Sequence, residues 1–388
     1  LFYKFRFTSF LLVRDSLLTS IFICQMSKDI LDYRGETWQF IVEWYDPHPQ
    51  MKKKYVLKYS VEPHQVEMVD MKSKRMFLKR CDCPPEITTN DFYVGNKIIL
   101  LSRELDIIDY ADSITRQKLQ HQMQRSLILF TPDSYHNWGK MLEIITNRLS
   151  LVKLRTVNFS EHQAENACQV LSLNTRRAPA LARGICLVAY VQGEDGIGML
   201  GEEAESLVAE YSAGETSPAL MCPYSGTQVN DFTEMLSTCQ PTSTLDSCTC
   251  CVIKPHAVKE RNVAKILDII ITQGYEVSAV ETLYFDKAAA EEFLEVYKGV
   301  VPEYVDQVNH LSSGMSIALE IRAEDAVTVF RQTAGPWDVD MAKELQPTTI
   351  RALYGKDRVR NAVHCTDLPT DGNYECEYCF NIMSSSYN

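Results

Sequence analysis

Apolar and polar residues alternate with a period of two along the first part of the chain, and turn-forming sequences such as Asp46-Pro-His-Pro49 separate the alternating segments. Side chains at every second position of a β-strand share one face, so this pattern predicts strands with one buried face. Short strands with turns between them predict a small β-rich barrel or sandwich over residues 32–120. The predicted strands cover residues 38–44, 55–59, 66–69, 76–78 and 98–101.

After residue 120, strand-like apolar runs alternate with segments of helical period, which predicts an α+β fold. The order of elements in residues 241–388 suggests that this fold is ferredoxin-like. Strands are predicted over residues 126–130, 151–157, 184–190, 248–253, 275–284 and 315–321. Helices are predicted over residues 141–148, 263–272 (ended by Gly274), 288–297, 304–311 and 324–333.

The bulk composition is that of a soluble globular protein with two or three domains. The chain has 388 residues, of which 45% are hydrophobic and 23% are charged. The net charge of −12 argues against nucleic acid as a partner. The segment between residues 52 and 80 is a local exception to this negative charge, because it contains nine Lys and Arg residues and only three acidic residues. This basic surface predicts either an acidic partner or an ordinary solvated face.

Residues 1–25 are apolar and basic, but Arg14-Asp15 interrupts the run, so a membrane-spanning helix is not expected. No other segment is long and apolar enough to span a membrane. The charges and the missing small-residue cleavage site also disfavour a signal peptide. Met26-Ser27-Lys28 has the appearance of a natural start. We expect residues 1–31 to be an unstructured extension outside the fold, with organelle targeting as the alternative.

The 13 cysteines are scattered and do not form the pattern of a disulfide framework, which favours a reducing compartment. Cys81-Asp-Cys83 has the wrong spacing for a zinc knuckle. Cys376-Glu-Tyr-Cys379 has a plausible pair spacing, but no second His or Cys pair follows at a zinc-finger distance. The sequence therefore predicts no protein-bound metal and cysteines that act as small buried hydrophobic residues.

Chemistry is concentrated near the C-terminus, where Arg351, Asn361 and His364 fall within fourteen positions. About a hundred residues earlier, a strand-like run ends in Lys254-Pro255-His256. Imidazole is a good nucleophile at neutral pH, and cations neutralise the charge on phosphoryl oxygens. These residue types therefore suit phosphoryl transfer through histidine. The chain has no Gly-x-x-x-x-Gly-Lys-[Ser/Thr] motif, so a nucleotide would not be bound by a P-loop.

The order Lys-Pro, then Arg, then Asn-x-x-His resembles the nucleoside diphosphate kinases over roughly the last 140 residues. The resemblance implies transfer of a γ-phosphoryl group from a nucleoside triphosphate to a diphosphate, with Mg²⁺ carried by the ATP or other NTP phosphates. It implies a nucleophile (His364), a carboxylate that orients it (Glu375), phosphate ligands (Lys254, Arg331, Arg351), a ribose and phosphate ligand (Asn361), a base-stacking ring (Tyr304) and supporting residues (Tyr297, Thr366). Ordinary packing for Tyr304 and solvation for Glu375 stay open as alternatives.

Two positions depart from the family pattern. Trp337 stands where the family has a small hydroxyl residue near the phosphates, and Cys365 replaces the glycine that usually follows the histidine. Because phosphoryl transfer depends on positioning, a displacement of about 1 Å costs about a hundredfold in rate. We therefore expect activity at His364 that is retained but weakened.

Residues 121–240 resemble a degenerate copy of residues 241–388. Both begin with a strand that runs into a proline, but Thr131 stands in the place of Lys254. No histidine occurs between His162 and His256, so this copy has no nucleophile in the expected region. We expect an inactive kinase-like domain that packs on the active one as a pseudo-dimer, which would allow the chain to remain monomeric.

Residues 32–120 resemble the DM-ten domain of ciliary and axonemal proteins, which implies a PH-like β-rich fold. The resemblance rests on Glu43-Trp-Tyr-Asp46, Val66-Glu-Met-Val-Asp70, Phe77-Leu-Lys-Arg80, Val94-Gly-Asn-Lys97 and Ile108-Asp-Tyr110. A DM-ten domain before two kinase-like domains resembles a branch of the kinase family that is associated with cilia, axonemal doublet microtubules and γ-tubulin complexes.

Two functional hypotheses follow. The first is a nucleoside diphosphate kinase that acts on nucleoside di- and triphosphates. The second is a mainly structural protein with weak or no kinase activity, whose partners are tubulin and axonemal proteins. Both imply a location in the cytoplasm and cytoskeleton, at the axoneme of a cilium or flagellum, with the centrosome as a further site.

Overall fold

The structure is a computed structural model, and it describes residues 35–46, 51–85, 87–94, 96–101, 103–122, 124–212, 214 and 217–384. The expected extension over residues 1–31 and most of the turn at residues 46–49 lie outside the described residues. The chain forms two compact units, Leu1–Gln120 and His121–Asn388. In the described part of the chain, no helix combines enough length with enough apolar character to cross a membrane.

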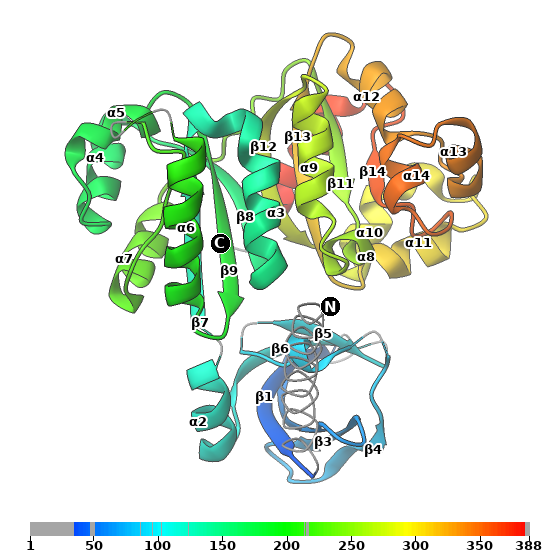
Figure 1. The fold of residues 1–388 in the computed structure, drawn as a ribbon. Helices are drawn as coiled ribbons and strands as arrows, with labels where there is room; N and C mark the ends of the chain where they lie inside the picture. The colour runs from blue at the N-terminus through cyan, green and yellow to red at the C-terminus, as the bar shows by residue number, and fades with distance from the viewer. Residues whose placement is uncertain are drawn as a thin grey trace, which may run out of the picture. The chain divides into compact units, whose positions relative to one another are not determined.

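The described part of the first unit is a curled antiparallel sheet with strand order β4-β3-β2-β1-β6-β5 (Figure 1). Alternate residues of β1, among them Phe40 and Val42, are fully buried, as the period of two predicts. Tyr59 stacks on Phe92 with 3.9 Å between ring centroids. The sheet with a following helix is the PH-like arrangement expected from the sequence. Its elements are β1 (Thr37–Asp46), β2 (Met51–Ser60), β3 (Gln65–Asp70), β4 (Met76–Asp82), β5 (Lys97–Leu100), β6 (Arg103–Tyr110) and α2 (Ser113–Gln122).

The second unit contains two halves with the same fold. The first half has the sheet order β10-β7-β9-β8, and the second half, read from its other edge, has β14-β11-β13-β12. The two orders are the same, because β11, β12, β13 and β14 correspond to β7, β8, β9 and β10 along the chain. All pairs are antiparallel. The first half comprises β7 (Gln124–Phe130), α3 (Trp138–Arg148), β8 (Ser150–Asn158), α4 (Glu161–Val170), α5 (Ala178–Leu181), β9 (Ile185–Gly193), α6 (Gly196–Tyr211), β10 (Leu220–Met221) and α7 (Gly226–Ser237).

The second half follows the predicted order of elements and adds short helices that the sequence did not predict. It comprises β11 (Cys248–Ile253), α8 (Pro255–Lys259), α9 (Val263–Thr272), β12 (Glu276–Tyr284), α10 (Lys287–Phe293), α11 (Tyr304–Leu311), β13 (Met315–Arg322), α12 (Ala326–Ala334), α13 (Val339–Leu345), α14 (Ile350–Tyr354), β14 (Val363–Cys365) and α15 (Gly372–Glu377), followed by a π-helical segment, Tyr378–Met383. Gly274 follows α9 with a φ of +88°, which confirms its predicted role at the helix end.

The two halves pack on each other through the edge strands β8 and β12, and two threonines make matching contacts. The Thr282 hydroxyl accepts from the Leu154 backbone N–H (2.8 Å) and donates to the Leu154 carbonyl (3.0 Å). The Thr156 hydroxyl accepts from the Val280 backbone N–H in the same way (2.9 Å). This reciprocity is the mark of a pseudo-twofold arrangement within one chain, as the repeat predicted.

The equivalent helices α3 and α9 also lie side by side (Figure 1). Their apolar faces, including Ile145 and Ile266, belong to one buried cluster that draws on both halves. Gly139 on α3 permits the close approach, because a Cβ there would lie 2.5 Å from Cβ and 2.6 Å from Cα of Asp268 on α9. The pairing of the halves is therefore a single continuous core.

We expect Gly139→Ala to lower the free energy of unfolding of the second unit by about 1–3 kcal/mol, because the added methyl group must push the two helices apart. The change is measured by urea denaturation. The control is Gly226→Ala, because a Cβ at this position of α7 meets no atom within 4 Å. Equal midpoints for the two variants would contradict the close packing of α3 and α9.

Candidate active site

His364 is the centre of the candidate site and lies on β14, which pairs with β11 so that His364 is opposite Val252. His364 is only 2% exposed. Its Nε2 lies 2.8 Å from Glu375 Oε2, and Thr366 Oγ1 donates to the same carboxylate oxygen over 2.8 Å. Thr366 is itself fixed, because its hydroxyl accepts from the Cys250 backbone N–H (3.0 Å). The carboxylate therefore holds Nε2 as the protonated nitrogen and leaves the lone pair on Nδ1.

Two aromatic rings confine the imidazole from the side. The ring centroid of Phe293 lies 4.9 Å from that of His364, and the ring of Tyr297 lies 6.3 Å away, both near edge-to-face. The Tyr297 hydroxyl donates to Asp367 Oδ2 over 2.6 Å. Arg331 on α12 forms an ion pair with the other oxygen of Asp367. Asp367 thus holds two of the predicted site residues near His364.

Lys254, at the end of β11, is 3% exposed. Its Nζ donates to Gln307 Oε1 (2.7 Å) and to the Val359 carbonyl (3.1 Å). Burial, followed by the charge of Arg351, lowers the pKa of Lys254 to about 7. A phosphate group beside it would raise this pKa again, because an opposite charge favours the protonated amine. The site therefore gains positive charge when an anion binds.

Arg351 on α14 is also buried, and backbone carbonyls hold its guanidinium. Nη1 donates to the Gly335 carbonyl over 2.8 Å, and Nε and Nη2 donate to the Val363 carbonyl over 3.3 and 3.2 Å. Since Val363 precedes His364, these bonds fix the guanidinium to the strand that carries the histidine. A buried cation satisfied by neutral carbonyls retains its full attraction for a phosphate.

The Trp337 indole lies close to both buried cations. Its ring centroid is 5.4 Å from Lys254 Nζ and 5.5 Å from Arg351 Cζ, and the Tyr297 ring is 5.6 Å away. Cation–π contacts of this kind contribute about 0.5–2 kcal/mol each, more when water is excluded. The indole therefore lies beside both of the groups that would bind phosphates.

Asn361 is fully buried, and its side-chain oxygen has no hydrogen-bond partner among the described residues. Its amide Nδ2 approaches the Trp337 carbonyl at 3.4 Å. An unpaired buried acceptor is costly, and a hydroxyl donor from a ligand would satisfy it. This is the property expected of a residue that binds a ribose hydroxyl.

A pair of histidines, the buried His256 and the half-buried His310, supports the loop before His364. His256 Nε2 accepts from the Ala362 backbone N–H (3.3 Å), and His256 Nδ1 lies 2.9 Å from His310 Nε2. Burial lowers the pKa of His256 to about 4 and that of His310 to about 3. Both rings are therefore neutral at pH 7, and His256 can accept at Nε2 while it donates from Nδ1.

Tyr304 begins α11 and packs against the apolar cluster that contains Phe293. Its hydroxyl approaches the Glu291 carbonyl at 3.4 Å. Three residues beside the site were not predicted. Asp367 follows Thr366 directly, so local spacing contained a signal for it. Gln307 and Phe293 lie on helices that were predicted, but only the fold brings their side chains to Lys254 and His364.

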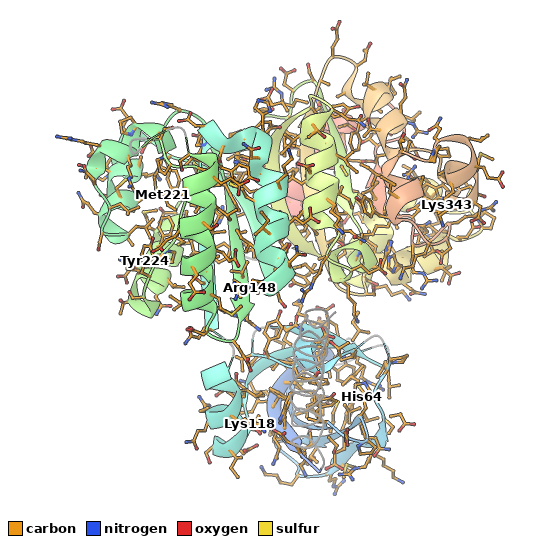
Figure 2. All side chains as sticks on the ribbon, viewed as in Figure 1. His64, Lys118, Arg148, Met221, Tyr224 and Lys343 are labelled. Atoms are coloured by element: carbon orange, nitrogen blue, oxygen red, sulfur yellow. The ribbon has the colours of Figure 1, made fainter. Side chains whose placement is uncertain are left out.

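The first half of the unit lacks these groups at the equivalent positions. Phe130, which precedes Thr131, pairs with Leu220, just as Ile253, which precedes Lys254, pairs with Val363. Met221, labelled in Figure 2, therefore stands where the second half has His364. Met221 and Phe232, eleven positions later, are buried in one apolar cluster. The histidine–carboxylate pair is replaced by apolar packing, so this half cannot form a phosphohistidine there.

Comparison with known proteins gives one consistent family. Residues 247–384 match the family model described as nucleoside diphosphate kinase. The chain is 34% identical to nucleoside diphosphate kinase homolog 7 of Rattus norvegicus over 377 residues, which cover 91% of this chain and 95% of that protein. The protein of the same name from Mus musculus is 34% identical over 375 residues, with the same coverage of both chains.

A solved structure is similar to about a third of the chain. The crystal structure of the Aquifex aeolicus nucleoside diphosphate kinase is 32% identical and covers 35% of this chain and 97% of that one, with a TM-score of 0.34.

Proposed function

Because this chain belongs to the family of nucleoside diphosphate kinase homolog 7, we propose that its C-terminal half transfers a phosphoryl group from a nucleoside triphosphate to a diphosphate through His364. The observation that carries the proposal is the bond of 2.8 Å between His364 Nε2 and Glu375, which leaves Nδ1 as the nucleophile. The buried cations Lys254 and Arg351 support it, since both lie within 5.5 Å of the centre of the Trp337 ring.

In the first step, Nδ1 of His364 attacks the γ-phosphorus of the triphosphate. A P–N bond forms, the P–O bond to the bridging oxygen breaks, and the diphosphate leaves with the electron pair. The Nε2 proton stays in its bond to Glu375, which stabilises the charge on the phosphorylated ring. Lys254, Arg331 and Arg351 neutralise the phosphoryl oxygens.

In the second step, a terminal oxygen of a second diphosphate attacks the phosphorus, the P–N bond breaks, and His364 regains its lone pair. Asn361 accepts from a ribose hydroxyl through its otherwise unpaired oxygen. Tyr304 stacks on the base, so little selectivity among bases is expected.

Mg²⁺ fits this site as a companion of the nucleotide. The phosphate-binding groups Lys254, Arg331 and Arg351 are cations, and Asp367 is already paired with Arg331. The chain therefore binds the phosphates with positively charged side chains, and the metal ion would be bound by the phosphates and not by the protein. When bound, Mg²⁺ would neutralise the negative charge that develops on the phosphates.

We expect the wild-type protein to incorporate label from γ-labelled ATP as an acid-labile, base-stable phosphohistidine. His364→Ala should abolish this label, and Glu375→Gln should slow its formation by up to about a hundredfold because the imidazole loses its orientation. The measurement is label per chain after gel separation at high pH. The control is His162→Ala, an exposed histidine of the first half. A wild type that stays unlabelled would refute the proposed reaction.

We expect Trp337→Thr to speed label incorporation by about tenfold, because a nucleotide no longer has to displace an indole held by two cations. The measurement is the single-turnover rate at subsaturating ATP. Trp337→Phe is the matched control, since it keeps an aromatic ring at the position and should give a smaller gain. An unchanged or slower rate in a folded Trp337→Thr protein would mean that the indole does not block the site.

A second candidate function is attachment to an acidic filament such as tubulin, in a cilium, an axoneme or a centrosome. The basic face of the first unit supports it. Lys52 and Lys54 flank Glu43, and Lys58 and Arg80 flank Glu67, so each carboxylate meets two cations. Lys72, Lys74, Arg75 and Lys79 are exposed and add positive charge, and they form no ion pair with a carboxylate among the described residues. The first half of the second unit has Met221 in place of a histidine, which is consistent with a structural role for that half.

We expect the triple substitution Lys72→Glu, Lys74→Glu and Arg75→Glu to weaken co-sedimentation with microtubules by about tenfold or more at low salt, since charge complementarity is reversed on one face. The matched control reverses three exposed lysines of the second unit: Lys140, Lys287 and Lys343. Equal binding of both variants, or no binding by the wild type, would argue against this surface.

A further inference from the structure

Four cysteines from the two ends of the C-terminal half meet in its core. Cys248 and Cys250 are two positions apart on β11 and face the same side of the sheet. Cys376 and Cys379 are three positions apart on the helical segment formed by α15 and the π-helical turn. The fold therefore brings the pair Cys248 and Cys250 next to the Cys376-x-x-Cys379 pair, although the two pairs are far apart in sequence.

Two of these sulfur atoms and one carboxylate lie close enough together to share a ligand. Cys250 Sγ and Cys379 Sγ are 3.8 Å apart and contact each other. The ligand atoms of Cys248, Cys376 and Glu320 all lie within 4.8 Å of one another.

Glu320, on β13, is fully buried. Its Oε1 accepts from the Thr244 N–H (2.9 Å), the Thr244 hydroxyl (2.6 Å) and the Ser278 hydroxyl (2.8 Å), which are neutral donors. Oε2 has a weaker contact, to the Leu245 N–H at 3.5 Å. No ion pair to Glu320 is found among the described residues. A buried carboxylate without a counter-charge is costly, and a divalent cation would supply that charge.

We propose that Cys248, Cys376 and Glu320 bind one Zn²⁺ ion. Thiolates and a carboxylate are ligands that zinc accepts, and three protein ligands leave the fourth tetrahedral position to a water molecule. Each thiol releases its proton to solvent as its Zn–S bond forms, so the affinity falls as the pH is lowered.

This site would fasten β11 to α15 directly behind the candidate active site. Cys376 follows Glu375, whose carboxylate contacts His364, and the Cys250 N–H donates to Thr366, which contacts the same carboxylate. The ion would hold the strand and the helix at a fixed separation. It would therefore position Glu375 without touching a substrate.

The test uses the full chain, purified under reducing conditions and without chelator. We expect about one zinc per chain by elemental mass spectrometry, and Co²⁺ in its place should give the intense visible bands of a tetrahedral thiolate site. Cys376→Ala and Cys248→Ala should each lower the affinity for Co²⁺ by about tenfold or more. The readout is metal content, so it does not depend on whether the protein transfers phosphate.

The matched control is Cys251→Ala, a buried cysteine on the same strand that faces the other side of the sheet. It should retain both the stoichiometry and the affinity for Co²⁺. Circular dichroism identifies any variant that does not fold. If a variant does not fold, the visible spectrum of the wild type with Co²⁺ tests the proposal in its place. A reduced wild type that binds no Zn²⁺ or Co²⁺, or a folded Cys376→Ala protein with unchanged affinity, would overturn the proposal.

Discussion

The pairing of β11 with β14 is the interaction on which the C-terminal half depends. This short antiparallel ladder aligns residues more than a hundred positions apart, with His364 opposite Val252 and the Lys254 N–H bonded to the Ala362 carbonyl (2.9 Å). It places the imidazole and the lysine at the same end of the sheet. A shift of one residue would turn His364 to the opposite face and separate it from Glu375. Local backbone register thus determines whether these groups can act together.

Much of the fold was predictable because burial follows a simple period. The predicted helix over residues 263–272 is α9, and the predicted strand over residues 248–253 is β11. The strand β6 was missed because acidic residues occupy its solvent-facing positions, where they pair with Lys97. The helices α13 and α14 have only seven and five residues, too few for a helical period to appear.

The site was predictable where its residues are close in sequence, as with Arg351, Asn361 and His364. The sequence could not predict the features of the site that arise from contacts between distant parts of the chain. The sequence indicated a bulky residue at Trp337, but not that the indole contacts both Lys254 and Arg351. Nothing in the spacing of Cys248 and Cys376 indicated that they meet, since strand pairing and helix packing create that proximity.

The reciprocal threonine contacts between β8 and β12 have a consequence for association. An edge strand normally offers unpaired N–H and C=O groups to any passing chain, which makes it a starting point for uncontrolled sheet growth. In the described residues, each of these two strands covers the outer edge of the other half. The first half therefore covers the edge strand of the second half within the same chain, so this edge is not open to pairing with another molecule.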